Sequence, residues 1–176
     1  RVISGTGATI SEALDKIGAC LSRPILLNHC AVIALGEDMT SSWLDKICDY
    51  CFKENRITMS AYMVSVKDPN MLLSRGAEAS VAVGYDIMGM IEQQSERTGI
   101  AYNSRYFEVE ARREGGKSVF TLPHFSCGED SMEIDGLSVF YRDRLAARLD
   151  NGSSGLYALM TGNFRCGTLR FGAEEY

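Results

Sequence analysis

The sequence predicts an α+β domain in which helices pack on an antiparallel sheet, and three observations support this fold class. The chain has 176 residues, of which 45% are hydrophobic and 23% charged, so its length and composition fit one folded domain. Segments with apolar residues at helical spacing are interspersed with segments in which apolar and polar residues alternate. The alternating segments come mostly in pairs, which is typical of antiparallel hairpins and not of a doubly wound parallel sheet.

The first element is a helix that begins after Thr9. Thr9 and Glu12 have the spacing of a capping box, in which each side chain accepts a hydrogen bond from the other residue's backbone N–H. Pro24 ends the segment, because proline disfavours helical backbone in the residue before it. Residues 24–27 and 31–35 are apolar runs on either side of a polar step, so they predict a strand pair or one bent strand.

A second helix is expected to start at residues 40–42, where Thr and Ser can cap a helix N-terminus, and to end at Asn55. Alternation over residues 57–66 predicts a strand. Residues 67–70 carry Asp, Pro and Asn, which predict a turn. Residues 79–84 fit either a strand or the start of the helix that follows.

Helical spacing over residues 85–97, with Gly99 in the C-cap position, predicts the third helix. Residues 106–111 and 118–122 then alternate on either side of a polar segment, 112–117, that contains two glycines. This is the strongest hairpin signal in the chain.

The last third begins with a polar loop over residues 126–135. Apolar residues at helical spacing over 137–149 predict a further helix. The Gly- and Ser-rich segment 151–155 is expected to break it, and residues 156–160 and 164–171 are expected to form a final strand pair.

Two pairs of residues are candidate zinc ligands: Cys48 with Cys51, and His124 with Cys127. Each spacing lets both side chains reach one metal ion, and two such pairs complete a tetrahedral zinc site. Packing is the alternative, because Cys48 and Cys51 fall on the apolar side of their helix and free cysteine behaves as a small hydrophobe. His124 and Cys127 also predict a general base and a thiol nucleophile. Apart from zinc, no cofactor is expected.

Aromatic residues and methionines form a second kind of candidate site. Pockets for small ligands are mostly apolar with a few polar groups. Such a ligand-binding cavity is expected to be lined by Trp43, Tyr62, Met63, Tyr85 and Met88. The alternative is an ordinary core, which is built from the same residue types.

Charge and hydropathy exclude several classes of protein. The net charge is -5, so the chain lacks the basic excess that phosphate binding needs, and we expect no direct contact with nucleic acid. No apolar run is long enough for a membrane helix, and no signal peptide is evident. Most of the six cysteines fall at expected core positions, which predicts a reducing, cytoplasmic location. The first residue is Arg1 and not Met, so we expect a trimmed chain, a mature form or a domain of a longer protein.

Residues 9–55 resemble the amino-terminal sensory region of PucR/CdaR-type bacterial transcription regulators, and more loosely PAS and GAF sensor domains. The likeness rests on the helix over 10–21, the apolar runs 25–27 and 31–35, and the helix that Trp43 leads. The resemblance implies a PAS/GAF-like, non-catalytic domain that senses a small molecule and regulates transcription through another part of the protein.

The expectation is therefore a single sensor-like domain over residues 1–176, which forms a homodimer and binds a small-molecule ligand. The alternative is a thiol- or zinc-dependent enzyme that uses His124 and Cys127.

Overall fold

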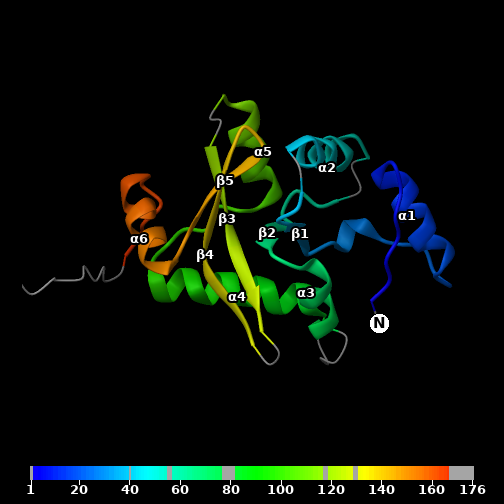
Figure 1. Ribbon diagram of the computed structural model, residues 1–176, viewed down its shortest axis with the longest axis horizontal. Coiled ribbons are helices and arrows are strands. Elements are labelled where there is room, and N and C mark those ends of the chain that lie inside the picture. The colour runs from blue at the N-terminus through cyan, green and yellow to red at the C-terminus, as the bar shows by residue number, and fades with distance from the viewer. Residues whose placement is uncertain are drawn as a thin grey trace, which may run out of the picture.

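A computed structural model describes residues 2–39, 41–54, 57–76, 82–116, 119–128 and 131–166. The fold is α+β, as the sequence predicts (Figure 1). The elements in chain order are α1 (Ile10–Ala19), the 3-10 helix η1 (Leu27–His29), β1 (Val32–Gly36), α2 (Ser41–Glu54), β2 (Tyr62–Val66), α3 (Pro69–Gly76), α4 (Val83–Thr98), α5 (Tyr106–Glu114), β3 (Val119–Cys127), β4 (Met132–Tyr141), β5 (Arg144–Leu149) and α6 (Asn151–Met160).

The described strands form one mixed sheet in the order β1-β2-β3-β4-β5. β1, β2 and β3 are parallel, and β3, β4 and β5 are antiparallel. The antiparallel prediction is therefore right for only half of the sheet. Parallel neighbours need long crossover connections, and here α2 joins β1 to β2 while α3, α4 and α5 join β2 to β3.

Helices cover both faces of the sheet (Figure 1). α3, α4 and α6 pack on the face that we call the first, and α2 and α5 pack on the second. A cluster of buried hydrophobic residues lies on each face, and we call them the first and second cluster after their faces. Because successive side chains of a strand point to opposite faces, Val64 of β2 belongs to the first cluster and Met63 to the second. All five residues of β2 are buried, so this strand lacks the polar face that alternation predicts.

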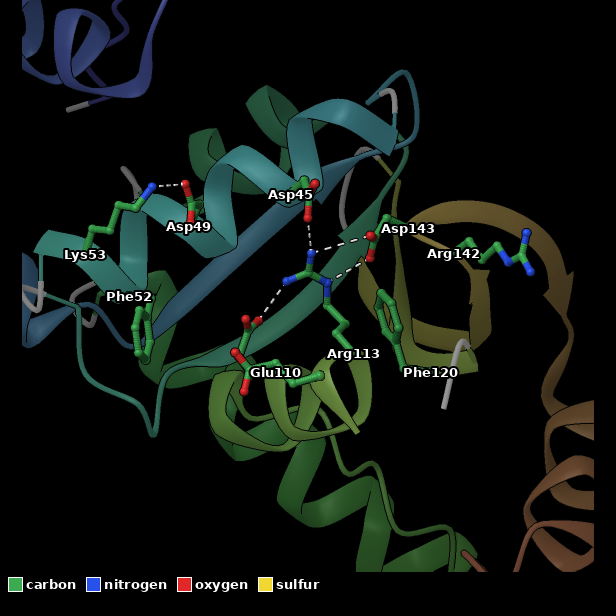
Figure 2. A pocket seen from close by; sticks show the side chains of 10 residues that line it. Asp45, Asp49, Phe52, Lys53, Glu110, Arg113, Phe120, Arg142 and Asp143 are labelled. Carbon is green, nitrogen blue, oxygen red and sulfur yellow. Dashed lines mark hydrogen bonds and ion pairs between the residues drawn. The ribbon is translucent and has the colours of Figure 1, made fainter. Parts of the chain in front are cut away.

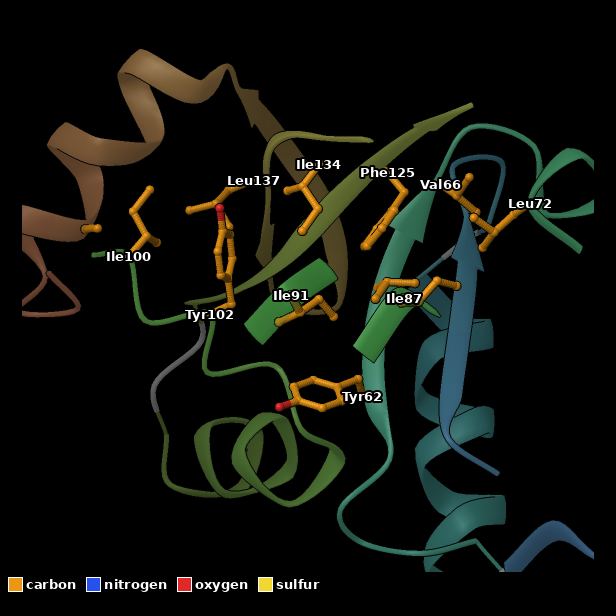
Figure 3. Packing of buried hydrophobic residues seen from close by; sticks show 12 residues of the cluster. Tyr62, Val66, Leu72, Ile87, Ile91, Ile100, Tyr102, Phe125, Ile134 and Leu137 are labelled. Atoms are coloured by element: carbon orange, nitrogen blue, oxygen red, sulfur yellow. The ribbon is translucent and has the colours of Figure 1, made fainter. Parts of the chain in front are cut away.

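The first face holds the cluster shown in Figure 3. Ile87 and Ile91 of α4 lie against Phe125 of β3 and Ile134 of β4. Removing each such side chain from water contributes about 1.5–3 kcal/mol. This packing fixes α4 beneath the sheet.

Three expected helices are confirmed as α1, α2 and α4. The Thr9 hydroxyl accepts a hydrogen bond from Glu12 N (3.1 Å), and Glu12 Oε2 accepts one from Ala8 N (2.8 Å) in place of Thr9 N. Gly99 caps α4 with φ +73°, a left-handed conformation that glycine adopts without a steric penalty.

The strongest predicted hairpin is wrong, because its first strand is the helix α5. Tyr106 and Val109 are buried three residues apart, and Glu108 Oε2 accepts a hydrogen bond from Arg105 N (2.9 Å) at the helix start. The predicted helix over 137–149 is wrong in the opposite sense, because this segment is the β4–β5 hairpin.

The remaining differences are local. The predicted break at 151–155 is the start of α6, where Asp150 accepts a hydrogen bond from Ser153 N (2.7 Å), and 156–160 continues that helix. The predicted turn at 67–70 leads into α3. The apolar run 24–27 forms no strand, and only its last residue, Leu27, belongs to η1. Parts of other predictions lie outside the described residues: Thr40, Asn55, 79–81, 117–118 and 167–171.

In the part of the chain that the structure describes, none of the helices has the length and apolar character that crossing a membrane requires.

We expect Gly136→Ala to destabilise the protein by more than about 2 kcal/mol. Gly136 has φ +145° beside an irregularity in the β3–β4 register, and an added Cβ would lie 1.9 Å from the Leu149 carbonyl oxygen. Urea unfolding measures the loss.

Gly89→Ala is the matched control, because Gly89 lies inside α4 and an added Cβ there meets nothing within 4 Å. We expect it to raise the free energy of unfolding by about 0.5–1 kcal/mol. Equal stability of the two variants would contradict the steric argument for Gly136.

Candidate functional site

A cavity of about 630 Å³ opens between α2, α5 and the turn that joins β4 to β5 (Figure 2). Five carboxylates and three basic side chains line it, so the lining is negative. The charged lining residues are Asp45, Asp49, Lys53, Glu110, Arg113, Glu114, Arg142 and Asp143, and the aromatic ones are Phe52 and Phe120.

Arg113 lies at the centre of this pocket and contacts three carboxylates from three elements (Figure 2). Its Nε donates to Asp143 Oδ1 and its Nη1 to Glu110 Oε2, both at 2.8 Å. Its Nη2 donates to Asp45 of α2. The Arg113 side chain is 13% exposed, so these contacts join α5, α2 and the β4–β5 turn away from bulk water.

The carboxylates keep Arg113 charged. Burial acts to lower the pKa of the guanidinium, but hydrogen bonds with Asp143 and Glu110 outweigh it, and the pKa stands above its usual value. Because three donor groups of Arg113 already meet protein carboxylates, the residue is not arranged to receive an anionic ligand. Asp45 and Asp49 keep side chains that are 70% and 60% exposed, although Asp45 pairs with Arg113 and Asp49 with Lys53.

The turn at the edge of the pocket has an unfavourable backbone. Arg142 and Asp143 have φ of +47° and +61°, the left-handed region that costs non-glycine residues roughly 1–2 kcal/mol each. The bidentate contact of Arg113 with Asp143 offsets part of this cost. The ion pair therefore determines where the pocket wall lies.

A row of polar side chains crosses the second face of the sheet at one end, and we call it the polar stripe. Its members are Glu37, which follows β1, Ser65 of β2, His124 of β3, Ser138 of β4 and Arg148 of β5. Ser65 Oγ donates to Ser138 Oγ (2.7 Å) and lies 3.1 Å from His124 Nδ1. Glu37 forms an ion pair with Arg148. The buried hydroxyls and imidazole thus satisfy one another.

The structure does not bring the four predicted zinc ligands together. Cys48 and Cys51 are buried in the second cluster, where burial raises the pKa of Cys48 and raises that of Cys51 to about 11. Cys127 packs against the first cluster, on the opposite face of the sheet. Among the described residues, no group of three or more His, Cys, Asp or Glu side chains can hold a metal ion.

The five residues predicted to line a ligand cavity are also dispersed. Met63 is buried in the second cluster, and Met88 packs against the first. Tyr85 is 60% exposed, and Trp43 lies under the Lys46 ammonium group at 4.5 Å. Tyr62 lines a cavity of about 430 Å³ together with Arg105 and Glu92.

Sequence reasoning missed the residues around Arg113 because it placed Arg113 in a hairpin turn. Glu110 and Arg113 are three residues apart, as are the buried Tyr106 and Val109. If the segment is recognised as a helix, the charged pair lies next to the buried apolar pair on its surface. The spacing then predicts an ion pair at the boundary between core and solvent.

Comparisons with known proteins all indicate one group. Residues 1–126 match the family described as "Spore germination protein N-terminal domain". The chain is 20% identical to spore germination protein GerQC of Bacillus cereus over 173 residues, which are 97% of this chain and 48% of that protein. It is 26% identical to putative spore germination protein YfkR of Bacillus subtilis (strain 168) over 151 residues, 82% of this chain and 38% of that protein.

The crystal structure of the GerBC protein has a similar fold, with a TM-score of 0.56 at 13% identity, over 89% of this chain and 44% of that one. The chain thus spans less than half the length of the curated relatives it matches.

We expect Arg113→Met to destabilise the protein by about 3 kcal/mol, because it leaves Glu110 and Asp143 as half-buried carboxylates without a counter-ion. Thermal or urea unfolding measures the change. Lys53→Met is the control in the same pocket, since the Lys53–Asp49 pair is exposed and contributes about 0.5 kcal/mol or less. Similar losses in both variants would show that Arg113 is no more important than a surface charge.

Proposed function

The chain belongs to the family of spore germination protein N-terminal domains, and from this premise we propose that it takes part in spore germination as a binding domain. The match over residues 1–126 is the observation that carries the proposal. The names of the relatives GerQC and YfkR support it. Because the relatives are more than twice as long as the part that matches, the role of the complete protein is part of the proposal.

Family membership corrects two expectations. The resemblance of residues 9–55 to PucR/CdaR-type sensors is wrong, since these residues lie within the match to the germination family, and a role in transcription regulation falls with it. The thiol- or zinc-dependent enzyme that would use His124 and Cys127 is wrong for the same reason. The structural likeness is to GerBC, where a PAS/GAF-like fold was expected.

The pocket around Arg113 is the surface that we assign to binding, and a positively charged group is the ligand chemistry that fits it. Asp45 and Asp49 place exposed carboxylates at its edge, and Glu114 adds another. The Phe52 ring is 63% exposed beside them and offers apolar contact to the stem of a lysine or arginine side chain. A basic segment of a protein partner combines both features.

Other expectations from the sequence stay predictions. They concern the small-molecule ligand, the homodimer, the cytoplasmic location, the lack of a cofactor and of nucleic-acid contact, and the single domain over residues 1–176.

Deletion of the coding region in the spore-forming organism is expected to slow germination, measured as the loss of optical density of a spore suspension after nutrient is added. Replacement by Asp49→Lys with Glu114→Lys should lower affinity for the partner roughly tenfold and slow germination at normal protein level, because both changes repel a basic group. Asp15→Lys, an exposed charge reversal on α1, is the control.

The outcomes separate the two parts of the proposal. Normal germination of the deletion strain would overturn the role in germination. A slow deletion strain, with a double variant that germinates like wild type, would overturn the assignment of the pocket alone.

A further inference from the structure

The ion pair between Glu37 and Arg148 connects the two edges of the sheet. Glu37 follows β1, the first strand in the sheet order, and Arg148 belongs to β5, the last. The Glu37 carboxylate also lies beside His124 of the central strand, with Oε1 3.7 Å from Nε2. One carboxylate therefore has two basic neighbours, and only one of them carries a permanent charge.

His124 is enclosed by polar groups from each strand around it. Ser65 of β2 and Ser138 of β4 lie 3.1 and 3.5 Å from Nδ1. On the other side of the ring, Asp135 Oδ1 lies 3.9 Å from Nε2, close to the Glu37 carboxylate. Arg148 of β5 reaches the ring only through Glu37. A proton added to this imidazole would thus meet two carboxylates at distances that a small movement turns into ion pairs.

Burial decides which state of the ring is present near neutral pH. The His124 side chain is 4% exposed, and this burial lowers the pKa below its usual value of 6.5, although the Asp135 charge acts against the shift. The ring is therefore neutral at pH 7, and Glu37 remains paired with Arg148.

We propose that protonation of His124 loosens the attachment of β5 to the rest of the protein. When the ring takes up a proton from solvent, the imidazolium attracts Glu37 and Asp135, and Arg148 loses its ion-pair partner. The site is separate from the pocket around Arg113 and goes beyond the role in germination. The consequence falls on β5 because this strand has no neighbour on its outer side in the described sheet, and five of its six residues are exposed. Once the ion pair is lost, β5 is therefore held mainly by its backbone pairing with β4, and side-chain packing adds little.

The chain contains two histidines, which makes the test direct. An NMR titration of the ring protons follows His124, and the exposed His29 is the site of a control substitution. His124 should titrate below pH 6.5, because burial lowers its pKa. Over the pH range in which His124 titrates, hydrogen-exchange protection factors of the β5 amides should fall about two- to fivefold, the effect of losing one partly exposed ion pair.

The free energy of unfolding should also depend on pH, and the direction of this dependence is defined. Because the pKa of His124 is lowered in the folded protein, the unfolded chain binds more protons between that value and 6.5. This contribution to the free energy of unfolding is complete above pH 6.5 and is lost as the pH falls through the folded pKa.

Three variants test whether His124 acts on β5 through Glu37. In His124→Gln and in Glu37→Gln, the protection factors of β5 should no longer depend on pH, while His29→Gln should behave like the wild type. The Glu37→Gln variant gives the answer even if His124→Gln does not fold, because it removes the shared carboxylate and keeps the imidazole. Titration of His124 at or above pH 6.5, or a fall in β5 protection that persists in Glu37→Gln, overturns the proposal.

Discussion

Strand β3 has a parallel neighbour on one side and an antiparallel neighbour on the other, and the rest of the structure depends on this double pairing. It places β2 and β3 in the interior of the sheet, where helices cover both faces. Any polar side chain on these strands must then find a partner within the sheet, because water does not reach it. Ser65, His124 and Ser138 meet this requirement through contacts with one another, on three adjacent strands.

The same burial explains the charges around Arg113. α5 lies on the second face because Tyr106 and Val109 pack into the cluster there. One turn later this helix brings Arg113 to the boundary between the core and solvent, where a guanidinium needs more than one acceptor. Glu110 from the same helix supplies one, and Asp143 from the β4–β5 turn supplies another. The carboxylates that remain exposed make the net charge of the pocket lining negative.

Local signals in the sequence were sufficient where an element stabilises itself. The cap at Thr9 and the left-handed Gly99 predicted α1 and α4 because both depend on residues close in the chain. The β4–β5 hairpin was missed because its turn contains Arg142 and Asp143 where Asn and Gly are usual, and a contact from Arg113 holds it in place. The pocket around Arg113 was missed for the same reason. The pocket assembles residues from α2, α5 and the hairpin, and a single sequence carries no information on their approach.

The β4–β5 hairpin is where these constraints meet, because two ion pairs hold it from opposite ends of β5. Arg113 holds Asp143 just before the strand begins, and Glu37 holds Arg148 near its end. Between these points the side chains of β5 are exposed, so hydrophobic burial adds little to its attachment. Beyond its antiparallel pairing with β4, this edge strand is therefore held mainly by charge, and it responds to any event that neutralises or recruits a carboxylate. A basic partner in the pocket would compete with Arg113, and a proton on His124 would compete with Arg148, so both act on the same strand through the same kind of interaction.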